Sequence, residues 1–304
     1  MTVTVQVGTL FLLMGVGYLL AKRGRLTAAA LPQLSFLLLY VVTPCIIIDT
    51  LQGGCEPGMA GGLVKATAAD LALYAVCALM CALFFRREAP DTRDTLRFSV
   101  VFGNTGFMGF PLIAAVLGQE ALIYAMPVFV AFQVAVWTYG ACLMGGREQL
   151  SLRKMLLSPP LIGIWVGLPL FFLGLRLPEP ISGTMGYLSD LNTPLAMVVI
   201  GAQMAAADLP ATFRGRRLYV SAALKLVVSP VLAGVLLLPF HLDPMSYTAL
   251  VVLAGVPTAG VTSMFAQQFG RDTDSAAQSI TLSTLLSIIT LPVVAVLAQR
   301  AAGL

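Results

Sequence analysis

The sequence predicts an all-α polytopic membrane protein with ten transmembrane helices, arranged as two inverted five-helix repeats. Three observations predict this class. The 304 residues are 58% hydrophobic and only 11% charged, with a mean hydropathy of +0.91, whereas soluble domains carry about 25% charged residues. Apolar segments of about 20 residues, the length that a bilayer requires, recur along the whole chain. Basic residues alternate between successive connections, which defines two sides of a membrane.

The connections between the apolar segments are short, so we expect no sizeable soluble domain. The net charge of +4 is too small and too scattered to indicate a nucleic-acid partner. Four of the five cysteines fall inside apolar segments without zinc-type spacing to histidine, so we interpret them as small core residues. The first segment is followed, not preceded, by basic residues, unlike a signal peptide. The expected spans are 3–21, 31–51, 62–85, 96–117, 121–146, 155–175, 183–206, 218–239, 246–269 and 275–298.

Fourteen of the 18 Lys and Arg side chains lie in the connections after odd-numbered spans or, for Arg97, at the edge of the following span. The opposite side has only Arg176 and Arg300, and Lys65 and Lys225 lie within spans. By the positive-inside rule the first set is cytoplasmic, so both termini are expected outside. The fourteen are Lys22, Arg23, Arg25, Arg86, Arg87, Arg93, Arg97, Arg147, Arg153, Lys154, Arg214, Arg216, Arg217 and Arg271.

Ten spans with both termini on one side divide into two halves of five, 1–146 and 155–304. Because five is odd, the second half must insert upside down. Each half has a Thr-Pro pair in its second span, at 43–44 and 193–194, and a Gly/Pro-rich interruption in its fourth, at 103–112 and 255–263. Either interruption alone also fits a merely kinked helix, since Gly and Pro are common in membrane spans. Corresponding interrupted spans in two halves favour a transporter that binds its substrate at the breaks.

The chain resembles the auxin efflux carrier family of bacterial permeases, related to the plant PIN carriers. The stretches that carry the resemblance run in order along the whole chain: Gly-Asn-Thr-Gly-Phe-Met-Gly-Phe-Pro-Leu at 103–112, Pro-Leu-Ala-Met with Ile-Gly-Ala-Gln-Met at 194–204, Leu-Lys-Leu-Val-Val-Ser-Pro at 224–230, and Gly-Val-Pro leading to Ala-Gln-Gln-Phe-Gly at 266–270. The resemblance implies fourth and ninth spans that unwind and cross at their breaks. It also implies transport of small organic anions such as malonate, malate or auxin-like carboxylates. The long central loop of the plant carriers is absent.

Asn104 is the first candidate for substrate contact, and the resemblance places the asparagine of this motif at the crossing. An amide can donate to a carboxylate without carrying charge, but it is costly in a membrane unless it is hydrogen-bonded. The alternative is that Asn104 only satisfies backbone groups exposed by the break. Half-helix N-termini after the breaks would offer free N–H groups to an anion, although threonines in spans often bond their own backbone. The substrate-binding candidates are Asn104, Thr105, Thr43, Asn192, Thr193, Thr258, Thr262 and Ser263, and the expected breaks lie at Gly103, Gly106, Pro111 and Pro257.

Three ionisable residues within spans are candidates for ion coupling or for a counter-ion to the substrate: Asp190, Lys225 and Asp70. Ionisable residues at membrane depth are functional by default. Lys225 lies about seven residues into its span, near 10 Å by helical rise, so it could also snorkel to the surface.

We therefore predict a secondary transporter of small organic anions in a bacterial cytoplasmic (inner) membrane, working by alternating access. A sodium- or proton-coupled carboxylate symporter is the alternative, in which Na⁺ or H⁺ would be the coupling ion. We expect no cofactor and no metal. The chain could assemble as a homodimer. A membrane-embedded enzyme is disfavoured because the only histidine, His241, falls in an outer loop. A non-transporting sensor is disfavoured because we expect no signalling domain.

Overall fold

The computed structural model describes residues 3–27, 29–52, 54, 58–149, 153, 156–206 and 209–304. Regular structure in these ranges is helical, apart from one isolated β-bridge. Within the described ranges, five continuous helical segments are long and apolar enough to cross a membrane, and four shorter apolar helices accompany them. The predicted all-helical membrane protein with several apolar spans is confirmed. The described cysteines, Cys45, Cys77, Cys81 and Cys142, are free thiols, while Cys55 and Lys154 lie outside the described residues.

The first half of the chain contains five successive helical segments, of which the fourth is interrupted. Its elements are α1 (Val3–Lys22), α2 (Ala30–Leu37), η1 (Leu38–Val42), α3 (Thr43–Leu51), α4 (Met59–Ala82), α5 (Pro90–Val101), η2 (Thr105–Gly109), α6 (Phe110–Leu117), η3 (Gln119–Ala125), α7 (Met126–Ala135), η4 (Val136–Gly140), α8 (Ala141–Gly145) and the short η5 (Arg147–Gln149). The elements α2, η1 and α3 form one continuous helix, as do η3, α7, η4 and α8.

The second half repeats this order of segments with an additional short helix, α13. Its elements are α10 (Pro159–Leu173), α11 (Glu179–Asp190), α12 (Asn192–Ala206), α13 (Leu209–Arg214), α14 (Arg216–Ala223), η6 (Leu224–Val228), α15 (Ser229–Leu236), η7 (Leu238–Phe240), α16 (Pro244–Ala254), α17 (Val261–Gln268) and α18 (Thr273–Ala302). The segment that begins at Arg216 is continuous to Phe240.

Two of the continuous helices contain a π-helical turn directly before a Ser/Thr-Pro pair. Proline cannot donate the backbone hydrogen bond that an α-helix needs at its position, and its ring crowds the preceding turn. The wider turn relieves both problems, because the Thr43 hydroxyl donates to the Leu38 carbonyl at 2.8 Å and the Ser229 hydroxyl donates to the Leu224 carbonyl at 2.9 Å. π-turns of this kind occur frequently at functional sites.

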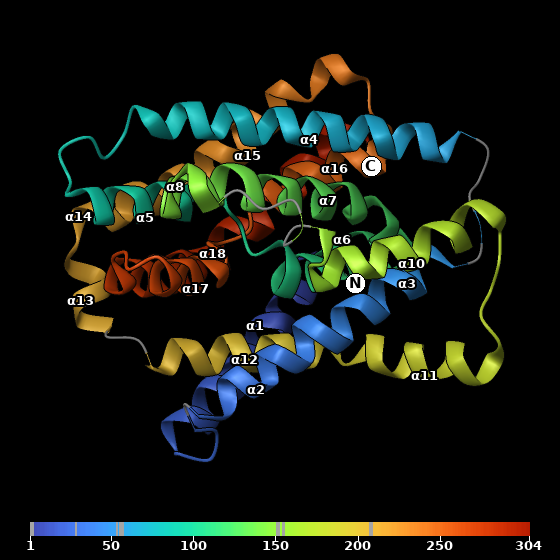
Figure 1. The fold of residues 1–304 in the computed structure, drawn as a ribbon, viewed down its shortest axis with the longest axis horizontal. Coiled ribbons are helices and arrows are strands. Elements are labelled where there is room, and N and C mark those ends of the chain that lie inside the picture. Colours follow the sequence, from blue (N-terminus) through green and yellow to red (C-terminus); the bar gives the residue numbers. More distant parts are fainter. Residues whose placement is uncertain are drawn as a thin grey trace.

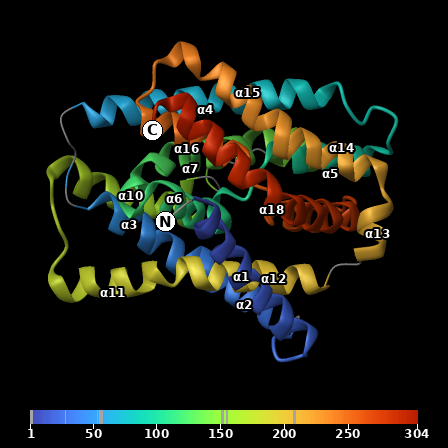
Figure 2. The ribbon, with the colours of Figure 1, turned by 180° about the vertical axis from the view of Figure 1, so that it is seen from behind.

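The helices form two bundles that face each other. In one bundle α1 packs on α12, and α3 packs on α10 and α11. The other bundle joins α4 to α7, and α18 to α5, α14, α16 and α17. Figure 1 and Figure 2 show α11, α12 and α2 along one side of the molecule and α4 with α15 along the other. The bundles meet where α1 and α12 contact η2, α6 and α18.

The α1–α12 crossing depends on two glycines that let the backbones touch. A Cβ atom added at Gly17 would collide with the Val198 carbonyl, and one added at Gly201 would collide with the Met14 carbonyl. Small residues at such positions are how membrane helices approach closely, since lipid provides no hydrophobic driving force between them.

The breaks in the fourth and ninth spans differ in one respect from the expectation. The chain leaves the helix at Phe102–Asn104, where Phe102 has an extended backbone (φ −99°, ψ 108°), and not at Pro111. Pro111 lies within the continuous helix Thr105–Leu117, directly after the π-turn η2, whose wider turn accommodates a residue that has no backbone N–H. Gly106 lies in the π-turn η2. In the ninth span the break covers residues 255–260, as expected around Pro257.

Candidate substrate site

The two interrupted spans bond to each other at their breaks. The Asn104 N–H donates to the Pro257 carbonyl at 2.7 Å, and the Ala259 N–H donates to the Phe102 carbonyl at 3.0 Å. Gly103 and Thr258 thereby form a two-residue antiparallel bridge. Backbone groups freed by a break in lipid must find partners within the protein, and here each break supplies the partners of the other.

Gly103 is required at this crossing by its neighbours. A Cβ atom at this position would lie 2.7 Å from Nζ of Lys225 and 2.8 Å from Cγ2 of Val256. The ammonium group of Lys225 therefore lies directly beside the crossed backbones. Lys225 does not extend to the membrane surface, which was the alternative for this residue.

Asn104 caps the second half of its own span. Its Oδ1 accepts a hydrogen bond from the Phe107 N–H at 3.2 Å, and its side chain is half-buried. This bond assigns the amide orientation, because an N–H needs an oxygen acceptor. Among the described residues, no group accepts a hydrogen bond from Nδ2 of Asn104. Asn104 therefore satisfies a backbone group near the break, which was the alternative to substrate contact. Its Nδ2 still has a donor that no described residue uses.

Asn192 is the most unusual polar residue of the described chain. It begins α12 directly after the helix α11 ends, and it is only 1% exposed. Neither its Oδ1 nor its Nδ2 has a hydrogen-bond partner among the described residues. The helix α12 packs against η1 and against η2, the π-turn that follows the crossing. A buried amide without partners costs free energy, so such a group indicates an absent ligand or water.

The hydroxyl candidates are arranged in different ways. Thr258 is buried, its hydroxyl donates to the Ser99 carbonyl at 2.9 Å, and its N–H donates to Oγ of Ser283 at 3.0 Å. Thr43 is buried and bonds within its own helix. The hydroxyl of Thr262 is fully buried without a partner among the described residues. The three remaining candidates differ in burial: Thr105 is buried, and Thr193 and Ser263 are half-buried.

Ser99 and Ser283, which were not predicted from the sequence, both accept hydrogen bonds from Thr258 at the crossing. A signal existed in the sequence, because Ser275, Ser279 and Ser283 recur every four residues and so share one face of the last span. That face is buried against the crossing and α5.

Asp70 and Lys225 line one small cavity beside the crossing, together with Tyr74, Cys77 and Ser229. Asp70 is 3% exposed and Lys225 is 4% exposed. They form no direct ion pair, and Oδ2 of Asp70 has no hydrogen-bond partner among the described residues. Asp190, by contrast, is exposed at the end of α11. The structure thus brings two of the three candidate ionisable residues together and leaves the third apart.

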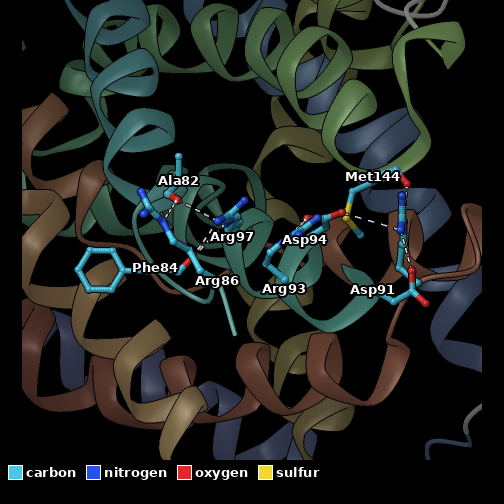
Figure 3. Close-up of polar contacts among 9 residues, drawn as sticks. Ala82, Phe84, Arg86, Asp91, Arg93, Asp94, Arg97 and Met144 are labelled. Carbon is cyan, nitrogen blue, oxygen red and sulfur yellow. Dashed lines mark hydrogen bonds and ion pairs between the residues drawn. The ribbon is translucent and has the colours of Figure 1, made fainter. Parts of the chain in front are cut away.

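The basic connections of the second bundle lie at one of its ends, where arginine side chains hydrogen-bond to neighbouring helices (Figure 3). Arg97 donates to the carbonyls of Ala82 and Phe84 at 2.9 and 3.0 Å, which closes the end of α4. Arg271 donates to the Met144 carbonyl and to Asp91, both at 2.7 Å. These contacts tie α4, α5, α8 and the α17–α18 turn together.

Asp272 caps α18 at the same end. Its carboxylate accepts hydrogen bonds from the Ser275 N–H at 2.9 Å, the Ser275 hydroxyl at 2.7 Å and the Thr92 hydroxyl at 2.6 Å. Partial burial by itself would raise the pKa of Asp272, but these hydrogen bonds and the charge of Arg217 outweigh it and leave the pKa below its ordinary value.

An all-helical membrane protein with paired, mutually bonded breaks and buried polar groups beside them has the architecture of a membrane transporter. A family profile described as "Membrane transport protein" matches residues 2–151 and again residues 148–295. The chain belongs to this family, the auxin efflux carrier family, and it contains the family's domain twice. It is a transporter-family member and not an enzyme.

Two curated relatives align with this chain over nearly the full length, and a third aligns over part of it. The chain is 26% identical over 300 residues to an uncharacterized transporter of Methanothermobacter thermautotrophicus, covering 95% of this chain and 96% of the relative. It is 28% identical over 302 residues to a candidate malonate transporter of Rhizobium meliloti, covering 92% and 91% of the two chains. An uncharacterized transporter of Methanocaldococcus jannaschii is 28% identical over 199 residues, covering 62% of this chain and 63% of the relative.

Proposed function

We propose that this protein is a secondary transporter of small organic anions, with mono- or dicarboxylates such as malonate, malate or auxin-like acids as substrates. The observation that carries the proposal is Asn192, an almost fully buried amide with both polar atoms unpartnered. It begins the helix that packs on the π-turn after the crossing. Asn104, whose Nδ2 is unused among the described residues, directly precedes that π-turn. Amide N–H groups and the Lys225 charge suit a carboxylate. The similarity to a candidate malonate transporter supports the same substrate class.

The transport cycle that we propose is alternating access between the two bundles. The substrate would bind where η2 faces α12, because this is a contact between the bundles. The ten spans would form two five-span units, 1–146 and 155–304, of opposite orientation. The packing supports such symmetry, since the first span packs on the seventh through α1 and α12, and the sixth packs on the second through α10 and α3. The termini would lie outside a bacterial cytoplasmic membrane.

The experiment is uptake of radiolabelled malonate into proteoliposomes, with malate and an indole carboxylate as competitors. We expect saturable uptake above that of empty liposomes. The matched variant is Asn104→Asp, because a carboxylate keeps the acceptor that caps Phe107 but removes the amide donor and adds a negative charge. This variant should keep the thermal stability of the wild type and lose uptake by at least tenfold. Failure of every carboxylate to enter, or wild-type uptake in Asn104→Asp, would refute the proposal.

A coupled symporter is the second candidate function, and the cavity that holds Asp70 and Lys225 favours it. A carboxylate and an ammonium group at membrane depth are the groups that transporters use as proton or cation sites. Uptake measured under an imposed pH gradient and, separately, under a sodium gradient distinguishes coupling from uniport. If coupling runs through this cavity, Asp70→Asn removes the gradient dependence. If Asp190→Asn removes it instead, the exposed carboxylate on α11 is the coupling site.

A further inference from the structure

A second hollow is lined by residues of the α13–α14 connection and the first turn of α14. Figure 1 shows α13 and α14 together at one end of the molecule. Its lining includes Arg214, Arg216 and Arg217, faced by Glu88 from the α4–α5 connection and Gln278 from α18. The recess is shallow and open to solvent. It is separate from the crossing, and nothing in the proposed transport cycle uses it.

The positive charge of this recess is only partly compensated. Arg217 donates to Glu88 at 3.2 Å, and the Asp272 carboxylate, which Thr92 and Ser275 already hold, lies near enough to feel the charge of Arg217. Arg214 and Arg216 have no carboxylate partner among the described residues. Two exposed guanidinium groups therefore face the hollow with five N–H donors each, the geometry that binds phosphate oxygens.

The position of the recess along the chain indicates its depth. Arg216 begins the segment Arg216–Phe240, which is long and apolar enough to cross a membrane. The first turn of such a segment emerges at the level of the lipid headgroups. Two aromatic residues flank the arginines, Phe213 at 48% exposed and Tyr219 at 41% exposed, and Tyr and Trp are typical of that level. The Tyr219 hydroxyl donates to the Phe213 carbonyl at 3.3 Å, which holds the turn together.

One helical turn deeper, Ser221 lies on the same face of α14 as Arg217 and Leu218. Ser221 is 1% exposed, and its hydroxyl has no hydrogen-bond partner among the described residues. The recess therefore has charged donors in its lining and exposed aromatic side chains at its flank.

We propose that this recess binds the phosphate-bearing headgroup of an anionic phospholipid. A lipid fits these features better than a free phosphate ion, because the exposed aromatic side chains and the apolar turn of α14 would contact its glycerol and acyl portions. The bound headgroup would bridge α13 and α14 to α18. Since α13 and α14 follow α12 in the chain, the lipid would hold the connection between the two bundles at the membrane surface.

The test compares the full-length wild type with Arg214→Gln/Arg216→Gln, which keeps the Arg217–Glu88 pair. The control is Arg23→Gln/Arg25→Gln, which removes the same charge from another exposed basic connection. Each protein in neutral detergent is titrated with phosphatidylglycerol, with phosphatidylcholine or with inorganic phosphate. Thermal unfolding and the number of lipids retained in native mass spectrometry are recorded.

We expect phosphatidylglycerol to stabilise the wild type and the control, and the recess variant to bind it roughly thirtyfold more weakly, since each surface arginine contributes about fivefold to the affinity. Phosphatidylcholine should have little effect. Equal responses of the wild type to both lipids, or an equal loss in the control, would overturn the proposal. A response to inorganic phosphate as large as that to phosphatidylglycerol would assign the recess to a soluble anion instead.

Discussion

The sharpest consequence of the proposed site is that Asn192→Leu should make the empty protein more stable while destroying binding. Leucine has the same number and branching of side-chain heavy atoms as asparagine and no polar atoms, although its two methyl groups occupy more volume. In the empty protein, both amide atoms of Asn192 are buried without partners among the described residues. An unsatisfied buried polar group costs about 1–3 kcal/mol. Removal of the amide should therefore raise the free energy of unfolding by at least about 1 kcal/mol, which corresponds to roughly 2–4 °C in Tm for a chain of this size class.

The same substitution removes the hydrogen bonds that Asn192 would make to a carboxylate. Each bond to a charged ligand contributes about 1.5–3 kcal/mol, so the affinity should fall roughly tenfold to a hundredfold for each bond that is lost. The assay is thermal unfolding of purified protein in a malonate titration, because a ligand raises Tm in proportion to its binding to the folded state. The variant should start at a higher Tm than the wild type and respond weakly to malonate.

The control is Ser246→Ala, since Ser246 is also fully buried with an unpartnered hydroxyl. It lies 11 residues before Pro257, about 16 Å by helical rise, and outside the proposed site. Ser246→Ala should be neutral or stabilising and should leave the malonate response unchanged. If Asn192→Leu lowers Tm by several degrees and binds malonate like the wild type, Asn192 is a structural residue and the reasoning is wrong.

Three further predictions concern packing, charge and topology. Gly17→Ala should destabilise the fold by several kcal/mol, because its Cβ meets the Val198 carbonyl, whereas Gly15→Ala has open space and should change little; thermal unfolding of both variants decides. Asp272→Ala should cost about 1 kcal/mol at neutral pH by loss of the α18 cap. Because the folded-state pKa of Asp272 is depressed, this difference should persist above its ordinary value of 3.8 and disappear as the pH falls below it; unfolding as a function of pH tests this, and a constant difference would contradict it. In a background without native cysteines, membrane-impermeant labelling should reach single cysteines only from the cytoplasm at positions 24, 90, 150 and 215, and only from outside at positions 56, 179 and 243.

The breaks in the fourth and ninth spans could be predicted because glycine and proline act locally. Pro257 and Gly103 both lie in the breaks that the sequence indicated. The expected break at Pro111 was wrong, since a proline that a π-turn accommodates within a helix and a proline that ends a helix look alike in sequence. The deciding contact is non-local: the Pro257 carbonyl accepts from the Asn104 N–H and so draws the chain out of the helix before Pro111 is reached.

The polar lining of the site was harder to predict than the breaks. A sequence shows which residues are polar but not which of them have partners. Thr258 and Asn192 looked equivalent as candidates, yet the Thr258 hydroxyl bonds the Ser99 carbonyl while the Asn192 amide bonds nothing in the described chain. The approach of Lys225 to Gly103 is also tertiary, because 122 residues separate them in the chain. Only the fold could distinguish a polar group with a hydrogen-bond partner from one without.

The proposed site has a physical reason to use amides rather than a fixed charge against the substrate. A transporter that alternates must also change state without its anion, and an unpaired arginine in the empty site would pay a large desolvation penalty in that step. An empty amide pays far less. The ammonium group of Lys225 lies beside the crossed backbones at Gly103 and lines a cavity with Asp70. In the proposed site, Lys225 would favour a nearby carboxylate through its electric field, and Asp70 would compensate its charge when the substrate is absent. On this reasoning the separation of charge from direct contact is what allows both the loaded and the empty protein to change state.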